Sequence, residues 1–165
     1  MQNEPLNQLS RIDYIRELIL DCRYDDAMEL LQKAMEEEPD NIDYNYELAR
    51  IFMEMGNYAS AISNLELVAD GVRNHLIYYM LAEAYQADEQ IDRAIGSYLK
   101  ALMLNEKFAP AYKKLGMLFL ARNDKASATE YFEDYLKLDI HQEEKEQVKQ
   151  ILKRMREKKW HKNLM

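Results

Sequence analysis

Few side chains in this sequence could perform metal or thiol chemistry. Its three histidines, His75, His141 and His161, lie in different segments, and none has a carboxylate or thiol at the spacing of a metal site. The one cysteine, Cys22, ends an apolar helical pattern, so we expect a small buried side chain rather than a reactive thiol. The glutamates at 36–38 point in different directions on a helix, and we interpret them as a solvated helix end. No metal site is expected.

The motifs of nucleophilic and phosphate chemistry are also missing from the sequence. It has no glycine-rich loop after a strand, no Gly-x-Ser-x-Gly turn, and no cysteine paired with a histidine at a recognisable spacing. We therefore expect no catalytic residues and no cofactor, and the sequence does not predict an enzyme. A function would then depend on a binding surface and on the elements that form it.

An alanine recurs along the chain at an almost constant spacing. Ala27, Ala61, Ala94 and Ala128 are separated by 34, 33 and 34 residues, a period typical of helix-turn-helix repeats. Each alanine falls early in the second of two amphipathic segments, where a methyl group allows two helices to approach closely. The stretch 78–104 shows the pattern best, with two apolar stripes at helical spacing and a turn between them.

Length and composition agree with a single all-helical domain. The chain has 165 residues, 48% of them hydrophobic, which is enough for one continuous core. Three prolines and four glycines are few residues for the turns of β-hairpins. The alternation of apolar and polar residues that is typical of strands is nowhere sustained. No apolar run approaches the roughly 20 residues of a membrane helix, and the N-terminus lacks a secretory signal. We expect a cytoplasmic protein.

The columns of this repeat resemble the tetratricopeptide repeat. The third copy matches that family's pattern at seven positions, which are Tyr78, Leu81, Ala82, Tyr85, Ala94, Tyr98 and Ala101. The fourth copy matches it at Tyr112, Leu115, Gly116, Phe119, Ala128 and Phe132. There are departures: only the second copy has the family's turn glycine, Gly56, and only the first has its closing proline, Pro39. In the first copy Ile15 occupies a position where a small residue is usual.

The resemblance implies an all-α fold, a right-handed α-solenoid of four tetratricopeptide-like helix-turn-helix repeats plus a C-terminal capping helix. We expect a flexible N-terminus over 1–9, a repeat domain over 10–142, and a capping helix with a basic tail over 143–165. The individual repeats would span about 8–41, 42–74, 75–108 and 109–142.

The segment after residue 142 is both amphipathic and basic. Val148, Ile151, Leu152 and Met155 share one helix face, and they would cover the last repeat, whose apolar face would otherwise be bare. Residues 147–165 have a net charge of +6, which leaves −14 on the rest of the chain. One interpretation is a stabilising cap, favoured up to about Arg156. The other is a detachable basic arm, favoured only over 158–165, where the apolar spacing ends.

In stacked repeats of this kind, the first helix of each pair lines a concave surface. Equivalent positions in the four copies mix tyrosines, methionines and charges, a composition suited to an extended or helical peptide. Our candidate partner-binding residues are Ile12, Arg16, Tyr46, Arg50, Met53, Tyr79, Glu83, Gln86, Lys113 and Met117. The alternative is that the apolar ones belong to the core and the charged ones are ordinary solvated side chains.

Members of the family usually bind other proteins, so the resemblance implies a non-catalytic scaffold or adaptor that binds a peptide or helix of a partner protein. The carboxylate clamp of chaperone-binding members is not expected, because its positions hold Ile12, Arg16, Glu47, Leu76 and Met80. Two alternatives remain. One is a structural subunit that homo-oligomerises or joins a larger complex. The other is a nucleic-acid partner for the basic tail, which the acidic body disfavours. No membrane partner is expected.

Overall fold

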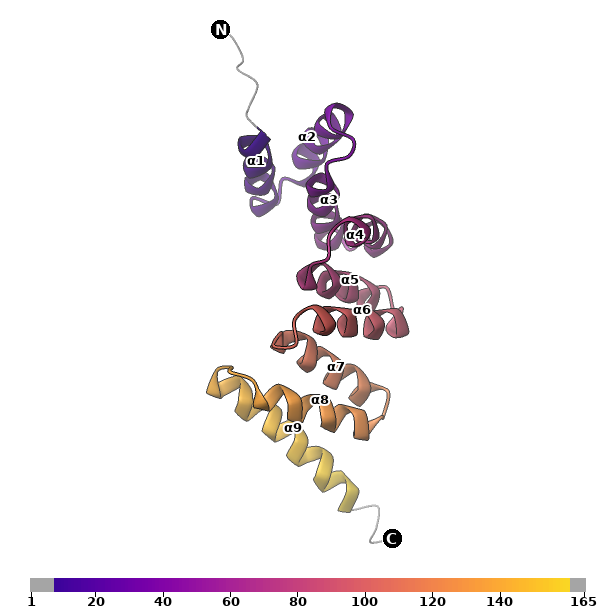
Figure 1. The fold of residues 1–165 in the computed structure, drawn as a ribbon, viewed down its shortest axis with the longest axis vertical. Helices are drawn as coiled ribbons and strands as arrows, with labels where there is room; N and C mark the ends of the chain where they lie inside the picture. The colour runs from indigo at the N-terminus through magenta and orange to yellow at the C-terminus, as the bar shows by residue number, and fades with distance from the viewer. Residues whose placement is uncertain (1–7, 161–165) are drawn as a thin grey trace.

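The computed structural model describes the backbone of residues 8–160 and the side chains of residues 11–157. Within this range the chain forms nine helices (Figure 1), which are α1 (Gln8–Leu20), α2 (Tyr24–Glu37), α3 (Ile42–Glu54), α4 (Tyr58–Gly71), α5 (His75–Ala87), α6 (Ile91–Leu104), α7 (Ala109–Ala121), α8 (Lys125–Lys137) and α9 (Gln142–Trp160). Most of the N-terminus expected to be flexible, and the last residues of the basic tail at 161–165, lie outside the described residues.

Successive helices form four hairpins, α1–α2, α3–α4, α5–α6 and α7–α8, which stack along the long axis of the molecule (Figure 1). The last helix, α9, packs on α8 at the far end of the stack. The prediction of an all-α solenoid of four helix pairs with a capping helix is therefore confirmed. None of the described helices combines the length and the apolar character that a membrane span requires.

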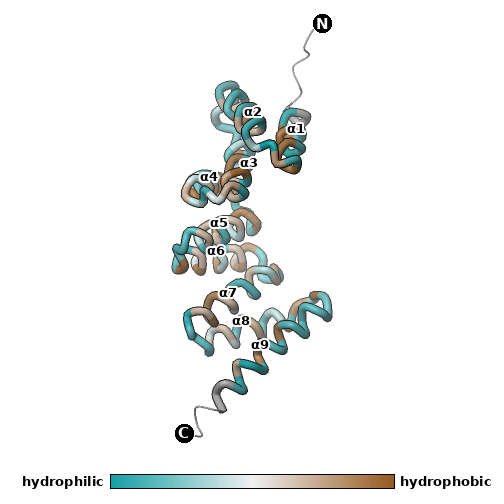
Figure 2. The backbone as a smooth tube through the Cα atoms, turned by 180° about the vertical axis from the view of Figure 1, so that it is seen from behind, coloured by the Kyte–Doolittle hydropathy of each residue, from teal (hydrophilic) through white to brown (hydrophobic). Residues whose placement is uncertain are grey.

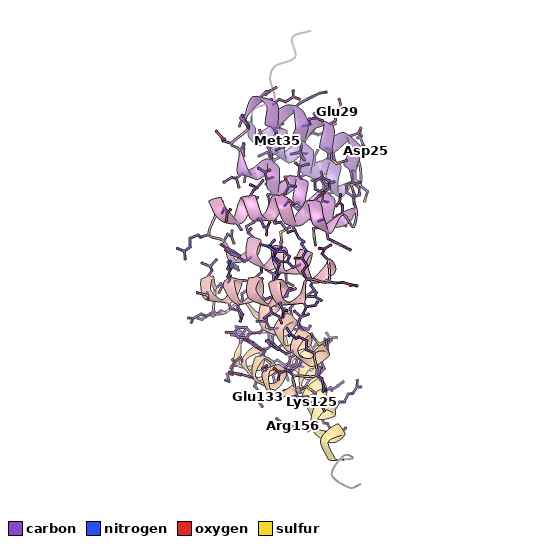
Figure 3. The ribbon with its side chains drawn as sticks, turned by 90° about the vertical axis from the view of Figure 1, so that its right-hand side faces the viewer. Asp25, Glu29, Met35, Lys125, Glu133 and Arg156 are labelled. Atoms are coloured by element: carbon purple, nitrogen blue, oxygen red, sulfur yellow. The ribbon has the colours of Figure 1, made fainter. Side chains whose placement is uncertain are left out.

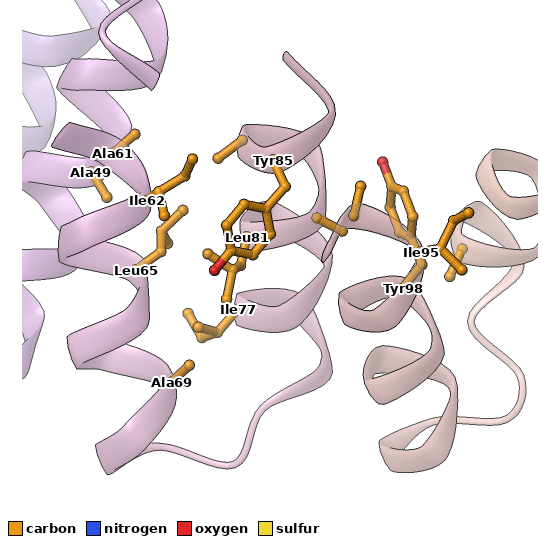
Figure 4. Packing of buried hydrophobic residues seen from close by; sticks show 14 of the residues in the cluster. Ala49, Ala61, Ile62, Leu65, Ala69, Ile77, Leu81, Tyr85, Ile95 and Tyr98 are labelled. Carbon is orange, nitrogen blue, oxygen red and sulfur yellow. The ribbon is translucent and has the colours of Figure 1, made fainter. Parts of the chain in front are cut away.

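The recurring alanines all lie in the core. Ala27, Ala61, Ala94 and Ala128 are all fully buried, as are the residues four positions after them, Leu31, Leu65, Tyr98 and Phe132. The core also continues between hairpins: Figure 4 shows Ile62 and Leu65 of α4 directed towards Leu81 and Tyr85 of α5. Figure 2 shows hydrophobic and hydrophilic residues alternating along the helices, with α9 mostly hydrophilic. The repeat in the sequence therefore corresponds to a repeat in the packing of buried side chains between helices.

The turns inside the hairpins share one hydrogen-bonded geometry. Each contains one residue with a left-handed backbone, which is Cys22 (φ 58°), Gly56 (φ 71°), Glu89 (φ 60°) or Asn123 (φ 61°). The next N–H donates back to the preceding helix, as from Arg23 N to Leu18 O at 2.8 Å, and so pairs a carbonyl that the helix end leaves free. Cys22 is exposed, so the prediction of a buried cysteine is wrong, because this residue belongs to the turn and not to the apolar stripe.

The first hairpin is more open than the others. The helices α1 and α2 pack less closely than the two helices of each later hairpin (Figure 1). Ile15 is fully buried at the position where the later hairpins have Ala49, Ala82 and Gly116. Since the distance between helix axes depends on the side chains at their contact, the larger isoleucine holds α1 away from α2. The helix α1 also contacts α3 directly.

The helix α9 covers the end of the solenoid. Its residues Val148, Leu152 and Met155 are at most 8% exposed and join one apolar cluster with Phe132 and Tyr135 of α8. This contact is what a capping helix requires. The side chains of residues 158–160 lie outside the described residues, so the interpretation of 158–165 as a detachable basic arm stays a prediction.

Candidate functional site

The candidate partner-binding residues lie on the first helices of the four hairpins, α1, α3, α5 and α7, whose shared surface we call the first-helix face. The repeat spacing places them at equivalent turns: Ile12 and Arg16 on α1, Tyr46, Arg50 and Met53 on α3, Tyr79, Glu83 and Gln86 on α5, and Lys113 and Met117 on α7. Their contacts divide them into residues that hold the solenoid together and residues that are available to a partner.

Arg16 and Arg50 form ion pairs with a buried carboxylate. Glu47 is fully buried and accepts hydrogen bonds from Arg16 Nε at 2.7 Å and from Arg50 Nη1 at 2.6 Å. The hydrogen bond to Glu47 raises the pKa of the Arg16 guanidinium, although burial opposes it. A buried carboxylate needs such partners, because an unpaired charge is costly away from water. The two arginines therefore join α1 to α3, and each still has part of its side chain exposed.

Tyr79 and Gln86 help to join α5 to its neighbours. The Tyr79 ring lies 5.5 Å from the Tyr98 ring and 5.1 Å from the Phe108 ring. Burial raises the pKa of the Tyr79 hydroxyl, and the nearby charge of Glu83 raises it further. The Tyr98 hydroxyl donates to Gln86 Oε1 at 3.1 Å. Both candidate residues thus have structural contacts as well as partial exposure.

A cleft of about 360 Å³ opens on the first-helix face between α3, α5 and α7, and we call it the first-helix cleft. It brings together three of the candidates, Met53, Glu83 and Gln86. Lys114 of α7 closes one side of it through an ion pair with Glu83 at 2.8 Å. The complete lining is Met53, Glu54, Tyr58, Glu83, Gln86, Ala87 and Lys114. Its wall thus combines apolar side chains with charges of both signs.

The other four candidates differ in accessibility. Ile12 is only 8% exposed and belongs to the core cluster of the first hairpin, so it offers little area to a partner. Tyr46 is half-buried and packs against the core of the middle hairpins. Lys113 is partly exposed, and Met117 is 48% exposed on the same helix. These last two are the candidates least engaged in holding the fold.

Sequence reasoning missed several residues of interest. It gave no role to Lys114, which lies 31 residues after Glu83, the same separation as that between Arg16 and Glu47, whose side chains pair across neighbouring first helices. It also missed a second cleft of about 450 Å³ on the opposite side of α5, where Arg93 Nη2 lies 2.6 Å from Glu66 and its guanidinium lies over the Tyr85 ring at 4.3 Å. Among the described side chains, no three His, Cys, Asp or Glu residues are grouped so that they could hold a metal ion.

Comparisons with known proteins agree with this repeat architecture. Two family models, both described as tetratricopeptide repeat, match residues 18–84 and 79–143. The TPR repeat-containing protein MJ1428 of Methanocaldococcus jannaschii is 26% identical over 115 residues, which are 69% of this chain and 20% of that protein. Superkiller protein 3 of Schizosaccharomyces pombe is 24% identical over 133 residues, covering 74% of this chain and 10% of that protein. This chain therefore spans only a small part of the length of these relatives.

Solved structures show the same fold. MamA 41-end from Desulfovibrio magneticus RS-1 superposes with a TM-score of 0.73 at 23% identity, over 81% of this chain and 76% of that chain. A crystal structure of MamA gives a TM-score of 0.73 at 20% identity, over 92% of this chain and 97% of that chain. At identities of 23% and 20%, these superpositions show a shared fold only. Because the two matching family models together span most of the chain, from residue 18 to residue 143, this chain belongs to the tetratricopeptide repeat family.

Proposed function

We propose that this chain is a non-catalytic scaffold or adaptor that binds an extended or helical segment of a partner protein on its first-helix face. Tetratricopeptide repeat proteins generally mediate contacts between proteins, which supports a protein partner. The observation that supports this particular face is the first-helix cleft, where Met53, Gln86 and the Glu83–Lys114 ion pair line about 360 Å³. Methionine adapts to different partner shapes, and the paired charges provide hydrogen-bonding groups at the rim.

The contacts described above determine which residues can test this proposal. Changing Arg50 would leave the buried Glu47 with one partner fewer, and changing Tyr79 would remove ring contacts between α5 and its neighbours. Either change would mix a loss of stability with a loss of binding. Lys113 and Met117 of α7 avoid this problem, since both are accessible and neither belongs to the core clusters of the described residues.

The experiment compares two double variants. A partner captured from the native cell on the immobilised chain is identified by mass spectrometry, purified, and titrated calorimetrically. We expect Lys113→Ala/Met117→Ala to weaken binding by on the order of 2 kcal/mol, about 30-fold in Kd, if these are central contacts. The control, Met103→Ala/Lys107→Ala, removes the same two residue types from exposed positions on and after α6. Equal affinities for the two variants would exclude Lys113 and Met117 as contacts of the partner.

A further inference from the structure

The two ends of the solenoid have opposite charge. Residues 8–41, which form the first hairpin, contain ten acidic and four basic side chains. Residues 149–160, in the second half of α9, contain six basic and one acidic. These segments lie at opposite ends of the long axis (Figure 1). Even if every basic residue of the first hairpin paired with an acidic one, an excess of negative charge would remain there.

At the first end, the negative charge is arranged on one face of α2. Asp25, Glu29, Gln32 and Glu36 follow one another at spacings of four, three and four residues, so they share a helix face, and all four are exposed. We call this face the acidic stripe. Lys33 pairs with Glu29 at 2.6 Å, the one ion pair that the structure shows for a member of the stripe among the described side chains. Figure 3 shows Asp25, Glu29 and Met35 at this end of the molecule.

At the other end, a groove lies between the start of α8 and the last turns of α9, and we call it the terminal groove. It has a volume of about 660 Å³. Leu120, Ile151 and Met155 give it an apolar lining, and its polar lining residues are Asn123, Lys125, Arg154 and Glu157. Glu157 lies 3.9 Å from Lys153 of the same helix. The structure shows no ion pair for Lys125 or Arg154 with any side chain it describes. Figure 3 places Lys125 at the end of the molecule opposite Asp25 and Glu29.

We propose that the terminal groove of one copy of this chain receives the acidic stripe of α2 from a second copy. The groove offers two cations that form no ion pair with a described carboxylate, while its one acid, Glu157, pairs with Lys153. The stripe offers carboxylates in excess of its own cations, so the contact would pair charges of both ends. The half-buried methionines Met28 and Met35 border the stripe on α2 and would face the apolar lining. Opposite charges also steer the two ends together during encounter.

The geometry of the contact determines the kind of assembly. A single chain cannot make it with itself, because the stripe and the groove lie at opposite ends of the long axis. Two copies joined in this way still have one free stripe and one free groove. Such a head-to-tail contact therefore extends into a row of copies instead of closing as a symmetric dimer. It leaves the first-helix face accessible, so it goes beyond the proposed binding function and does not depend on it.

Sedimentation velocity of the full chain tests this contact. At low ionic strength the average sedimentation coefficient should rise with protein concentration. The rise should disappear at high salt, because the Debye length falls from about 30 Å at 0.01 M to about 3 Å at 1 M. The groove variant Lys125→Glu/Arg154→Glu and the stripe variant Asp25→Lys/Glu36→Lys should each sediment as monomers. An equimolar mixture of the two should associate again, because each variant then meets a complementary end.

A control variant separates the local contact from net charge. Arg73→Glu/Lys107→Glu changes the total charge by the same amount as the groove variant, at exposed positions in the middle of the chain, and should associate like the natural sequence. Circular dichroism establishes that each variant is folded. A sedimentation coefficient of the natural sequence that does not change with concentration at low salt would overturn the proposal. So would association that persists in the groove variant, or a mixture that stays monomeric.

Discussion

Small residues determine how closely the helices of each hairpin approach. Gly116 of α7 shows this most directly, because a methyl group built on its Cα would lie 2.6 Å from Cε1 of Phe132, a fully buried ring of α8. Gly96 of α6 is different, since a methyl group there would meet no atom within 4 Å apart from its chain neighbours and the nearby backbone of its own helix. The two glycines therefore have opposite roles, one needed for packing and one merely lowering helix propensity.

Replacing each glycine by alanine should have effects of opposite sign. Gly96→Ala should stabilise the chain by roughly 0.5 to 1 kcal/mol, since alanine loses less backbone entropy in a helix. Gly116→Ala should destabilise it by about 1 to 3 kcal/mol, because Phe132 has to move within a packed core. Urea denaturation of both variants gives the two free energies of unfolding. Two shifts of the same sign would contradict this packing of α7 on α8.

Predictions for single residues were confirmed at positions where the repeat pattern required one property, such as a small buried side chain. The alanine column predicted a buried contact in all four repeats, and each alanine is buried. Cys22 failed, because without the family's turn glycine the sequence did not show that this residue adopts a left-handed backbone. The role of Glu47 was also missed, because its burial depends on two arginines brought together from different repeats. Such contacts follow from the spacing between helices, which a single sequence does not specify.

Among the elements, α9 has the most distinct role. It packs on α8 and ends the stack with a mainly hydrophilic surface (Figure 2). The Tyr135 hydroxyl of α8 donates to Glu144 of α9 at 3.0 Å, and Arg156 lies 3.4 Å from Glu133 of α8. The apolar period of the sequence predicted this helix and its buried face. It did not predict that α1 would lie apart from α2, which depends on the accommodation of Ile15.

Two truncations should separate the cap from the tail beyond it. Ending the chain after His141 removes the buried side chains of Val148, Leu152 and Met155. Because burial of each contributes about 1.5 to 3 kcal/mol, the free energy of unfolding should fall by several kcal/mol. This product should unfold at much lower temperature or aggregate. Ending the chain after Glu157 keeps these contacts and should leave the thermal midpoint nearly unchanged. A stable, monodisperse product from the shorter chain would rule out a stabilising role for α9.

At the scale of the whole molecule, buried tyrosine hydroxyls connect neighbouring helices along the stack. Tyr85 of α5 donates to Glu66 of α4, Tyr98 of α6 donates to Gln86 of α5, and Tyr135 of α8 donates to Glu144 of α9. Burial, together with the hydrogen bond to a carboxylate, raises the pKa of Tyr85 and of Tyr135 from 10.0 to about 12. These three contacts between helices therefore share one chemistry, and it depends on protonated hydroxyls.

This shared chemistry predicts that the chain loses stability in alkaline solution. Well below pH 10 these tyrosines are protonated in both the folded and the unfolded chain, so they add no pH dependence there. Between about pH 10 and pH 12 the unfolded chain releases protons that the folded chain retains, so the free energy of unfolding falls as the pH rises. Urea midpoints measured at several pH values from 9 upwards, roughly one unit below the ordinary tyrosine pKa, would show the decline.

The double variant Tyr85→Phe/Tyr135→Phe isolates the two hydroxyls responsible for part of that decline. Phenylalanine cannot ionise, so this variant should be less stable near neutral pH, where it lacks two hydrogen bonds, but its stability should fall less steeply above pH 10. The matched control is Tyr14→Phe, which removes the hydroxyl of a side chain that is 42% exposed on α1. If the double variant declined as steeply as the natural sequence, ionisation of Tyr85 and Tyr135 would not be what weakens the joints of the solenoid.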